Sequence, residues 1–150
     1  MSKGHSTLSA TSLVASTGLV AIGVAINSGL EPSVRTVPAL FVISIGLVGI
    51  VSGVSHRPLD QLRRSTKRWW LVTFVAFLPY GIVAAPSSAG SAALGEALSE
   101  VLPTTIFEAV AGATLLCAIS ITALYAMGLY GIHPGRPAPE DRLLSEFGDD

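Results

Sequence analysis

Apolar residues occur along the chain in four long blocks separated by polar connections. The blocks cover about residues 8–30, 37–54, 69–85 and 105–132. Crossing about 30 Å of hydrocarbon takes roughly 20 apolar residues in a helix, so each block has or approaches the length of a membrane span. Lipid offers the backbone no hydrogen-bond partner, and four segments are too few to close a barrel. We therefore predict an all-α membrane protein, a four-transmembrane-helix bundle that runs up-down-up-down.

The first two connections differ in length and pattern. Residues 31–36 form a short loop, which makes the first two spans an antiparallel hairpin. Residues 58–68 are rich in basic side chains, and Pro58 suits the first turn of a helix. We predict a short basic helix there, leading into the third span.

The third connection, the outer 86–103 loop, carries an apolar stripe. Four apolar side chains recur at helical spacing, namely Leu94, Leu98, Val101 and Leu102. Glu96 and Glu100 fall outside this stripe. The pattern predicts a short amphipathic helix that lies on the outer membrane surface.

The overall composition agrees with a membrane protein. Of the 150 residues, 50% are hydrophobic and 13% are charged, and the mean hydropathy is +0.62. A soluble domain carries about 25% charged residues. The chain divides into a transmembrane domain, residues 1–132, and a Pro-rich, acidic tail, residues 133–150. The net charge of −1 gives no case for a nucleic-acid partner.

The distribution of basic residues predicts an orientation, because short cytoplasmic loops carry an excess of Lys and Arg. With the basic connection inside, a single basic residue, Arg35, lies outside. The inner set has eight members: Lys3, Arg57, Arg63, Arg64, Lys67, Arg68, Arg136 and Arg142. We predict a multi-pass protein of the plasma membrane with both termini in the cytoplasm.

The basic connection has two compatible interpretations. It can act as a topology determinant whose side chains are solvated. It can also bind anionic lipid headgroups, with each Lys or Arg near the surface contributing roughly 1 kcal/mol. The candidate headgroup contacts are Arg57, Arg63, Arg64, Lys67 and Arg68. Membrane lipids are thus the first partners that the sequence predicts.

Small residues at four-residue spacing indicate where helices approach closely, since apolar side chains alone gain little by leaving lipid. The candidate packing positions are Gly46, Gly49 and Gly53 in the second span and Ala21, Ala25 and Gly29 in the first. Packing within the bundle explains such a pattern, and so does the seam of a homo-oligomer.

Ionisable residues inside a membrane are functional candidates, and Glu108 is the one candidate in the four blocks. Thr105 and Glu108 match the capping-box pattern, which favours a helix cap at headgroup level. The alternative is a carboxylate that binds a proton or cation inside the bundle. Asn27 lies toward the same outer side, where it caps a helix end or hydrogen-bonds between helices. The two side chains could share a shallow polar site.

The sequence lacks the residue patterns of disulfide, metal-binding and common catalytic sites. Cys117 is the single cysteine, so no paired-cysteine site exists, and His5, His56 and His133 show no helix-ligand spacing. The chain contains no His-Glu-x-x-His, Gly-x-Ser-x-Gly, Walker or dinucleotide motif. We predict no catalytic, cofactor-binding or metal site.

Two functions remain as hypotheses. The first is a structural or accessory membrane protein, an interaction subunit that binds membrane lipids and a membrane protein partner. The second is a small homo-oligomeric transporter or channel that uses Glu108. An enzyme is the least supported class.

Overall fold

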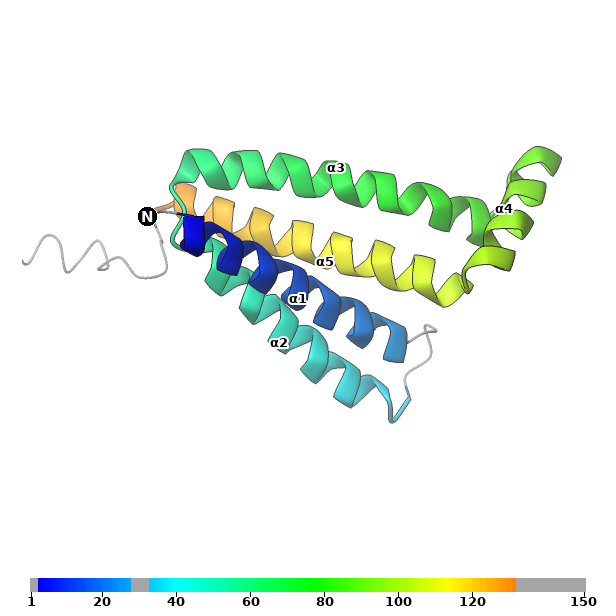
Figure 1. The fold of residues 1–150 in the computed structure, drawn as a ribbon, viewed down its shortest axis with the longest axis horizontal. Helices are drawn as coiled ribbons and strands as arrows, with labels where there is room; N and C mark the ends of the chain where they lie inside the picture. The colour runs from blue at the N-terminus through cyan, green and yellow to red at the C-terminus, as the bar shows by residue number, and fades with distance from the viewer. Residues whose placement is uncertain (1–2, 28–32, 132–150) are drawn as a thin grey trace, which may run out of the picture.

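The structure is a computed structural model that describes residues 3–27 and 33–131, with side chains from residue 11 onward. This part of the chain is all-helical, which confirms the predicted all-α class. Figure 1 shows the helices, which are α1 (Lys3–Ile26), α2 (Thr36–Val54), α3 (Leu59–Ala84), α4 (Ala89–Val101) and α5 (Thr104–Leu129). Gly29 and the tail, residues 133–150, lie outside the described residues.

The start of α3 differs from the sequence prediction. The basic segment 58–68 is not a separate short helix, because α3 continues without interruption from Leu59 to Ala84. Pro58 is its N-cap residue, and Asp60 lies in its first turn, where a negative charge is favourable. No glycine or proline follows until Pro79, so nothing in the sequence ends the helix at the predicted boundary.

The amphipathic helix predicted in the 86–103 loop is present as α4. It begins with a capping box in which the Ser88 side chain accepts from the Ser91 backbone N–H at 3.2 Å and Ser91 Oγ accepts from the Ser88 N–H at 2.9 Å. The axis of α4 is bent by 102° from that of α3. Gly95 permits the close contact between them, because a Cβ there would lie 2.9 Å from the Ile82 carbonyl oxygen.

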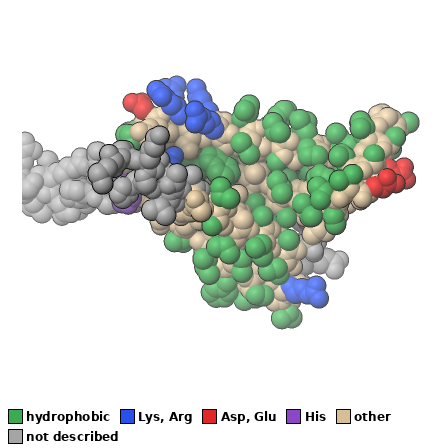
Figure 2. Space-filling model, in the orientation of Figure 1, with side chains coloured by type: hydrophobic (Ala, Val, Ile, Leu, Met, Phe, Trp, Pro, Cys, Tyr) green, Lys and Arg blue, Asp and Glu red, His purple; other side chains and the backbone are tan. Residues whose placement is uncertain are grey.

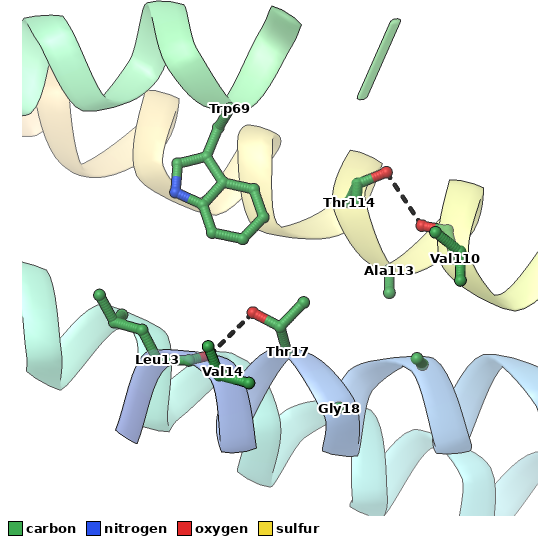
Figure 3. Close-up of a pocket in the computed structure, with 9 residues that line it drawn as sticks. Leu13, Val14, Thr17, Gly18, Trp69, Val110, Ala113 and Thr114 are labelled. Atoms are coloured by element: carbon green, nitrogen blue, oxygen red, sulfur yellow. Dashed lines mark hydrogen bonds between the residues drawn. The ribbon is translucent and has the colours of Figure 1, made fainter. Parts of the chain in front are cut away.

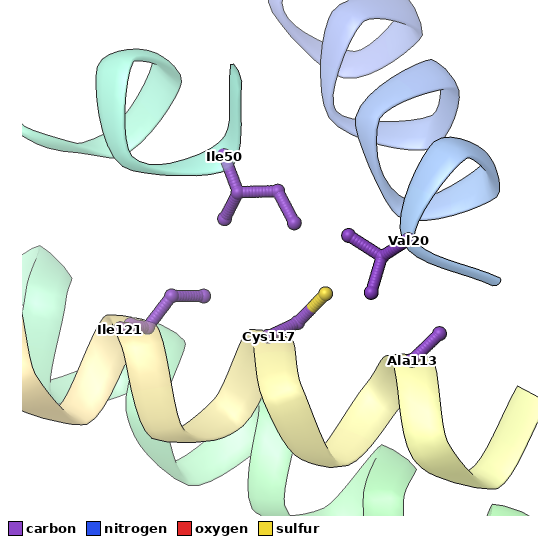
Figure 4. Packing of buried hydrophobic residues seen from close by; sticks show 5 residues of the cluster. All are labelled: Val20, Ile50, Ala113, Cys117 and Ile121. Atoms are coloured by element: carbon purple, nitrogen blue, oxygen red, sulfur yellow. The ribbon is translucent and has the colours of Figure 1, made fainter. Parts of the chain in front are cut away.

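Helix α5 occupies the middle of the assembly. It contacts α3, α1 and α2, while α1 pairs with α2 and α4 packs on α3. The long helices α1, α2, α3 and α5 run in alternating directions (Figure 1). Five fully or almost fully buried side chains from three of these helices meet at the core: Val20, Ile50, Ala113, Cys117 and Ile121 (Figure 4).

Helices α1 and α2 are in close contact along one seam. Gly46 is buried there, and a Cβ on it would lie 2.8 Å from the Ser16 carbonyl oxygen and 2.6 Å from Val20 Cγ2. A Cβ on Gly49 would clash with the Ser16 hydroxyl, and one on Gly53 would lie 3.3 Å from Leu13 Cδ2. Of these three glycines, Gly46 is the one that faces the backbone of α1 most closely, Gly49 faces a side chain, and the contact is loosest at Gly53.

Length and apolar composition identify two to three candidate membrane spans among the described residues. Thr36–Val54 and Thr104–Leu129 each qualify alone, and the bent pair α3 and α4 qualifies together. The apolar part of α1, Thr11–Ile26, is shorter than a full span. Two of the four long helices thus meet the criteria for a span on their own, and the four-span bundle expected from the sequence stays a prediction.

Charged side chains gather at the two ends of the molecule. Figure 2 shows Lys and Arg clustered at the start of α3, acidic side chains at α4, and a predominantly hydrophobic face between them. Phe41, Ile45 and Phe74 are among the large apolar side chains at the surface of the molecule, with 68%, 62% and 67% of their area exposed. An apolar surface of this extent is typical of helices that face lipid.

Candidate functional site

An apolar groove opens between α1 on one side and α3 with α5 on the other (Figure 3). Its volume is about 370 Å³. From α1 it is lined by Leu13, Val14, Thr17, Gly18 and Ala21, from α3 by Trp69, and from α5 by Val110, Ala113 and Thr114. Gly18 leaves part of this space empty, because a Cβ there would meet no atom within 4 Å.

The two hydroxyls in the groove are bonded within their own helices. Thr17 Oγ1 donates to the Leu13 carbonyl at 2.8 Å, and Thr114 Oγ1 lies 2.9 Å from the Val110 carbonyl (Figure 3). Such bonds remove the polar hydrogens from the groove wall. The groove therefore presents a surface suited to hydrocarbon.

A second, polar pocket of about 280 Å³ lies at the start of α3. It is lined by Arg57, Gln61, Arg64, Ser65 and Arg68. Positions three and four apart share one helix face, so the first turns of α3 present Gln61, Arg64, Ser65 and Arg68 together, and Arg57 joins them from just before the helix. Arg63 and Lys67, predicted with them as headgroup contacts, do not line the pocket.

Within residues 33–131, no acidic side chain forms an ion pair with the arginines of this basic pocket. Asp60 lies four residues before Arg64, but within the described chain no ion pair joins them. Each guanidinium carries five N–H donors in a planar fork and accepts nothing. Arginines around a concavity attract an anion, and their geometry favours carboxylate or phosphate oxygens.

Glu108 lies half-buried near the start of α5. It precedes by one turn Gly112, whose Cβ would lie 2.9 Å from Val24 Cγ1, so this face of α5 is turned toward the end of α1. Asn27 follows α1, with its backbone N–H 3.1 Å from the Val24 carbonyl oxygen. Glu108 and Asn27 thus lie at the same end of the bundle, but no hydrogen bond between them occurs in the described residues.

The capping box predicted for Thr105 and Glu108 is wrong. Helix α5 begins at Thr104 with Pro103 as N-cap, and no side chain caps it. Thr105 is therefore already inside the helix, where its hydroxyl cannot serve the first-turn amides. The box occurs instead at Ser88 and Ser91, where serine replaces the usual glutamate at the third helical position.

The described residues contain no group of three or more His, Cys, Asp and Glu side chains that could hold a metal ion. His56 is exposed and Cys117 is buried at the core. His133 lies outside the described residues, and the side chain of His5 is not described.

The apolar groove was not among the sequence predictions. Its walls come from three helices far apart in the chain, so no local pattern marks it. The packing residue Ala21 and the core residue Ala113 both belong to its lining. No known protein family, curated protein or solved structure matches the chain.

Proposed function

We propose that the protein is an integral membrane protein of structural or accessory role, a four-span helical bundle that supports a membrane protein partner. The observation that carries this proposal is the character of its interior. Buried side chains of α5 are small or apolar, including Ala109, Ala113, Cys117 and Ile121. Among the side chains that the structure describes, this interior is closely packed and offers no polar route, which favours a supporting role over conduction.

Two of the buried polar side chains, Thr73 and Thr114, support the same proposal. Thr73 Oγ1 donates to the Trp69 carbonyl at 2.8 Å, and Thr114 is bonded to carbonyls of its own helix. Hydroxyls bonded in this way have given their hydrogen to their own helix, so they are not donors to an anion or a water chain and keep only acceptor lone pairs. A conducting path would need polar groups that line a continuous channel.

All four long helices can serve as spans if charged ends reach the headgroup region. The apolar segment Thr11–Ile26 extends about 24 Å at about 1.5 Å per residue, and Trp69–Ala84 has the same length. Lys67 and Arg68 can extend their side chains to the interface, and Trp69 suits that depth. These features support four spans with the basic pocket on the cytoplasmic side.

Partner binding tests the accessory role. The protein carrying a C-terminal tag is purified in gentle detergent from its own membranes, and the complex is weighed by native mass spectrometry. We expect a second membrane protein in fixed stoichiometry with this chain. A species made of this chain alone, monomer or homo-oligomer, would contradict the accessory role.

Substitution of Glu108 distinguishes the accessory role from the alternative, a small homo-oligomeric transporter or channel. We expect Glu108→Gln to leave partner stoichiometry unchanged, because Glu108 forms no hydrogen bond or ion pair among the described residues. Proton or cation flux into liposomes is measured for both forms. A pH-dependent flux in the unmodified protein that Glu108→Gln abolishes would establish the transporter and refute our proposal.

The orientation is testable with reporters placed in single loops. We expect a cysteine introduced at Ser87, beside α4, to react with a membrane-impermeant maleimide in intact cells, while one at Gln61 reacts only after permeabilisation. The buried Cys117 serves as the unreactive background, being 0% exposed. Labelling of Gln61→Cys in intact cells would reverse the proposed orientation.

A further inference from the structure

The basic pocket and the apolar groove adjoin each other on one helix. Ser65 lines the pocket and Trp69 lines the groove, and positions four apart lie one above the other on a helix face. Arg68, which precedes Trp69 directly, also lines the pocket. A single molecule can therefore occupy both spaces, with a polar end at the pocket and an apolar part in the groove.

The chemistry of the pocket selects the polar end. Arg57, Arg64 and Arg68 supply three guanidinium groups, and Gln61 and Ser65 add neutral donors. A phosphate group offers several acceptor oxygens and negative charge, and it matches the planar fork of arginine. Basic pockets at the cytoplasmic side of spanning helices bind phospholipid headgroups in this way.

The dimensions of the groove select the apolar end. Its lining on α1 runs from Leu13 to Ala21, a rise of about 12 Å along the helix. This accommodates part of an extended hydrocarbon chain. Trp69 lines the end of the groove next in sequence to the pocket residue Arg68, and amphipathic aromatic rings are favourable at such a boundary.

We propose that the protein holds one anionic phospholipid, with its phosphate headgroup in the basic pocket and one acyl chain in the apolar groove between α1, α3 and α5. The adjacency along α3 of a positively charged pocket and a hydrocarbon-lined groove favours a lipid over a soluble anion. The proposal rests on the membrane placement given above but not on a protein partner. Partner stoichiometry and lipid retention are separate measurements, so either idea can fail alone.

The assignment of the headgroup to the basic pocket is tested by removing two positive charges from α3, either inside the pocket or outside it. Native mass spectrometry measures retention of phosphatidylglycerol and phosphatidylcholine by the detergent-solubilised protein. We expect Arg64→Gln with Arg68→Gln to weaken phosphatidylglycerol binding at least about tenfold. The matched control, Arg63→Gln with Lys67→Gln, removes equal charge outside the pocket and should change binding by no more than about twofold. Equal weakening by both pairs, or equal binding of the two lipids, overturns the proposal.

The acyl-chain half is tested by filling the groove. Gly18→Leu places a side chain in the empty space at Gly18, and we expect it to weaken phosphatidylglycerol binding about tenfold. The matched control is Gly81→Leu, because a Cβ on Gly81 also meets no atom within 4 Å and Gly81 does not line the groove. Protection of Cys117 from maleimide verifies that both variants are folded. Unchanged lipid binding in Gly18→Leu overturns the acyl-chain assignment.

Inorganic phosphate distinguishes a lipid from a soluble anion. We expect millimolar phosphate to displace little phosphatidylglycerol, because it lacks the apolar part that the groove accommodates. Displacement at micromolar phosphate, with Gly18→Leu still binding lipid normally, would mean that the pocket serves a soluble phosphate compound and would refute the lipid proposal.

Discussion

Gly46→Leu is expected to separate α1 from α2 and to destabilise the bundle by about 3 kcal/mol or more. The reason is that the new side chain would collide with backbone atoms of α1, which cannot move independently of the helix. A Cβ at Gly46 would lie 2.8 Å from the Ser16 carbonyl oxygen and 3.0 Å from the Val20 backbone nitrogen, so a whole helix must move. A loss of this size raises the unfolded fraction roughly a hundredfold.

Maleimide labelling of Cys117, the single cysteine, measures this destabilisation directly. Cys117 is fully buried, so a maleimide reaches it only when the bundle opens, and the labelling rate follows the opening equilibrium. We expect Gly46→Leu to accelerate labelling in detergent at least about a hundredfold. Gly53→Leu is the matched control on the same helix, because its nearest neighbour is the flexible end of Leu13 at 3.3 Å, and it should change the rate only slightly.

The result also decides between the two interpretations of the glycine pattern. If Gly46 lay at a seam between copies, its replacement would abolish oligomers and leave Cys117 protected. Slow labelling in Gly46→Leu, combined with a change of oligomeric state, would therefore contradict the seam with α1. The structure has that face of α2 already covered by Ser16 and Val20 of α1.

Periodicity and composition were sufficient to predict the helical class, because lipid-facing helices need only length and apolarity. They also located α4 from the spacing of Leu94, Leu98 and Val101. They missed the continuity of α3, since charged residues lowered the apolar signal while remaining good helix formers. A hydropathy pattern indicates which part of a helix faces lipid and which part faces water, but it does not indicate where the helix ends.

The candidate sites were less predictable because they are built from contacts between helices. Arg57, Arg64 and Arg68 were named from charge, but charge alone could not separate them from Arg63 and Lys67. That distinction depends on the helix face and on the concavity beside it. The groove forms because Gly18 of α1 and Trp69 of α3 line the same space, and no local sequence motif indicates that.

Helix α5 has one isoleucine in the core and one on its exposed face, so the two environments can be compared with the same side chain. Ile121 is 0% exposed and belongs to the core with Ile50 and Cys117, whereas Ile119 is 48% exposed. Leaving lipid gives an apolar side chain little free energy, so the contribution of Ile121 is mainly van der Waals contact with neighbours that cannot collapse. Lipid tails, in contrast, adjust to fill the space left at Ile119.

Ile121→Ala is therefore expected to destabilise the protein by about 2 kcal/mol or more, the cost of an unfilled core cavity. Ile119→Ala, which removes the same atoms two residues away, should change stability by less than about 0.5 kcal/mol. The free energy of unfolding is measured for both variants by denaturant titration in mixed micelles, with Cys117 labelling as an independent readout. Equal losses from the two variants would mean that both isoleucines have the same surroundings. The packing of α5 against α2 described here would then be wrong, and with it the closed apolar interior on which the supporting role depends.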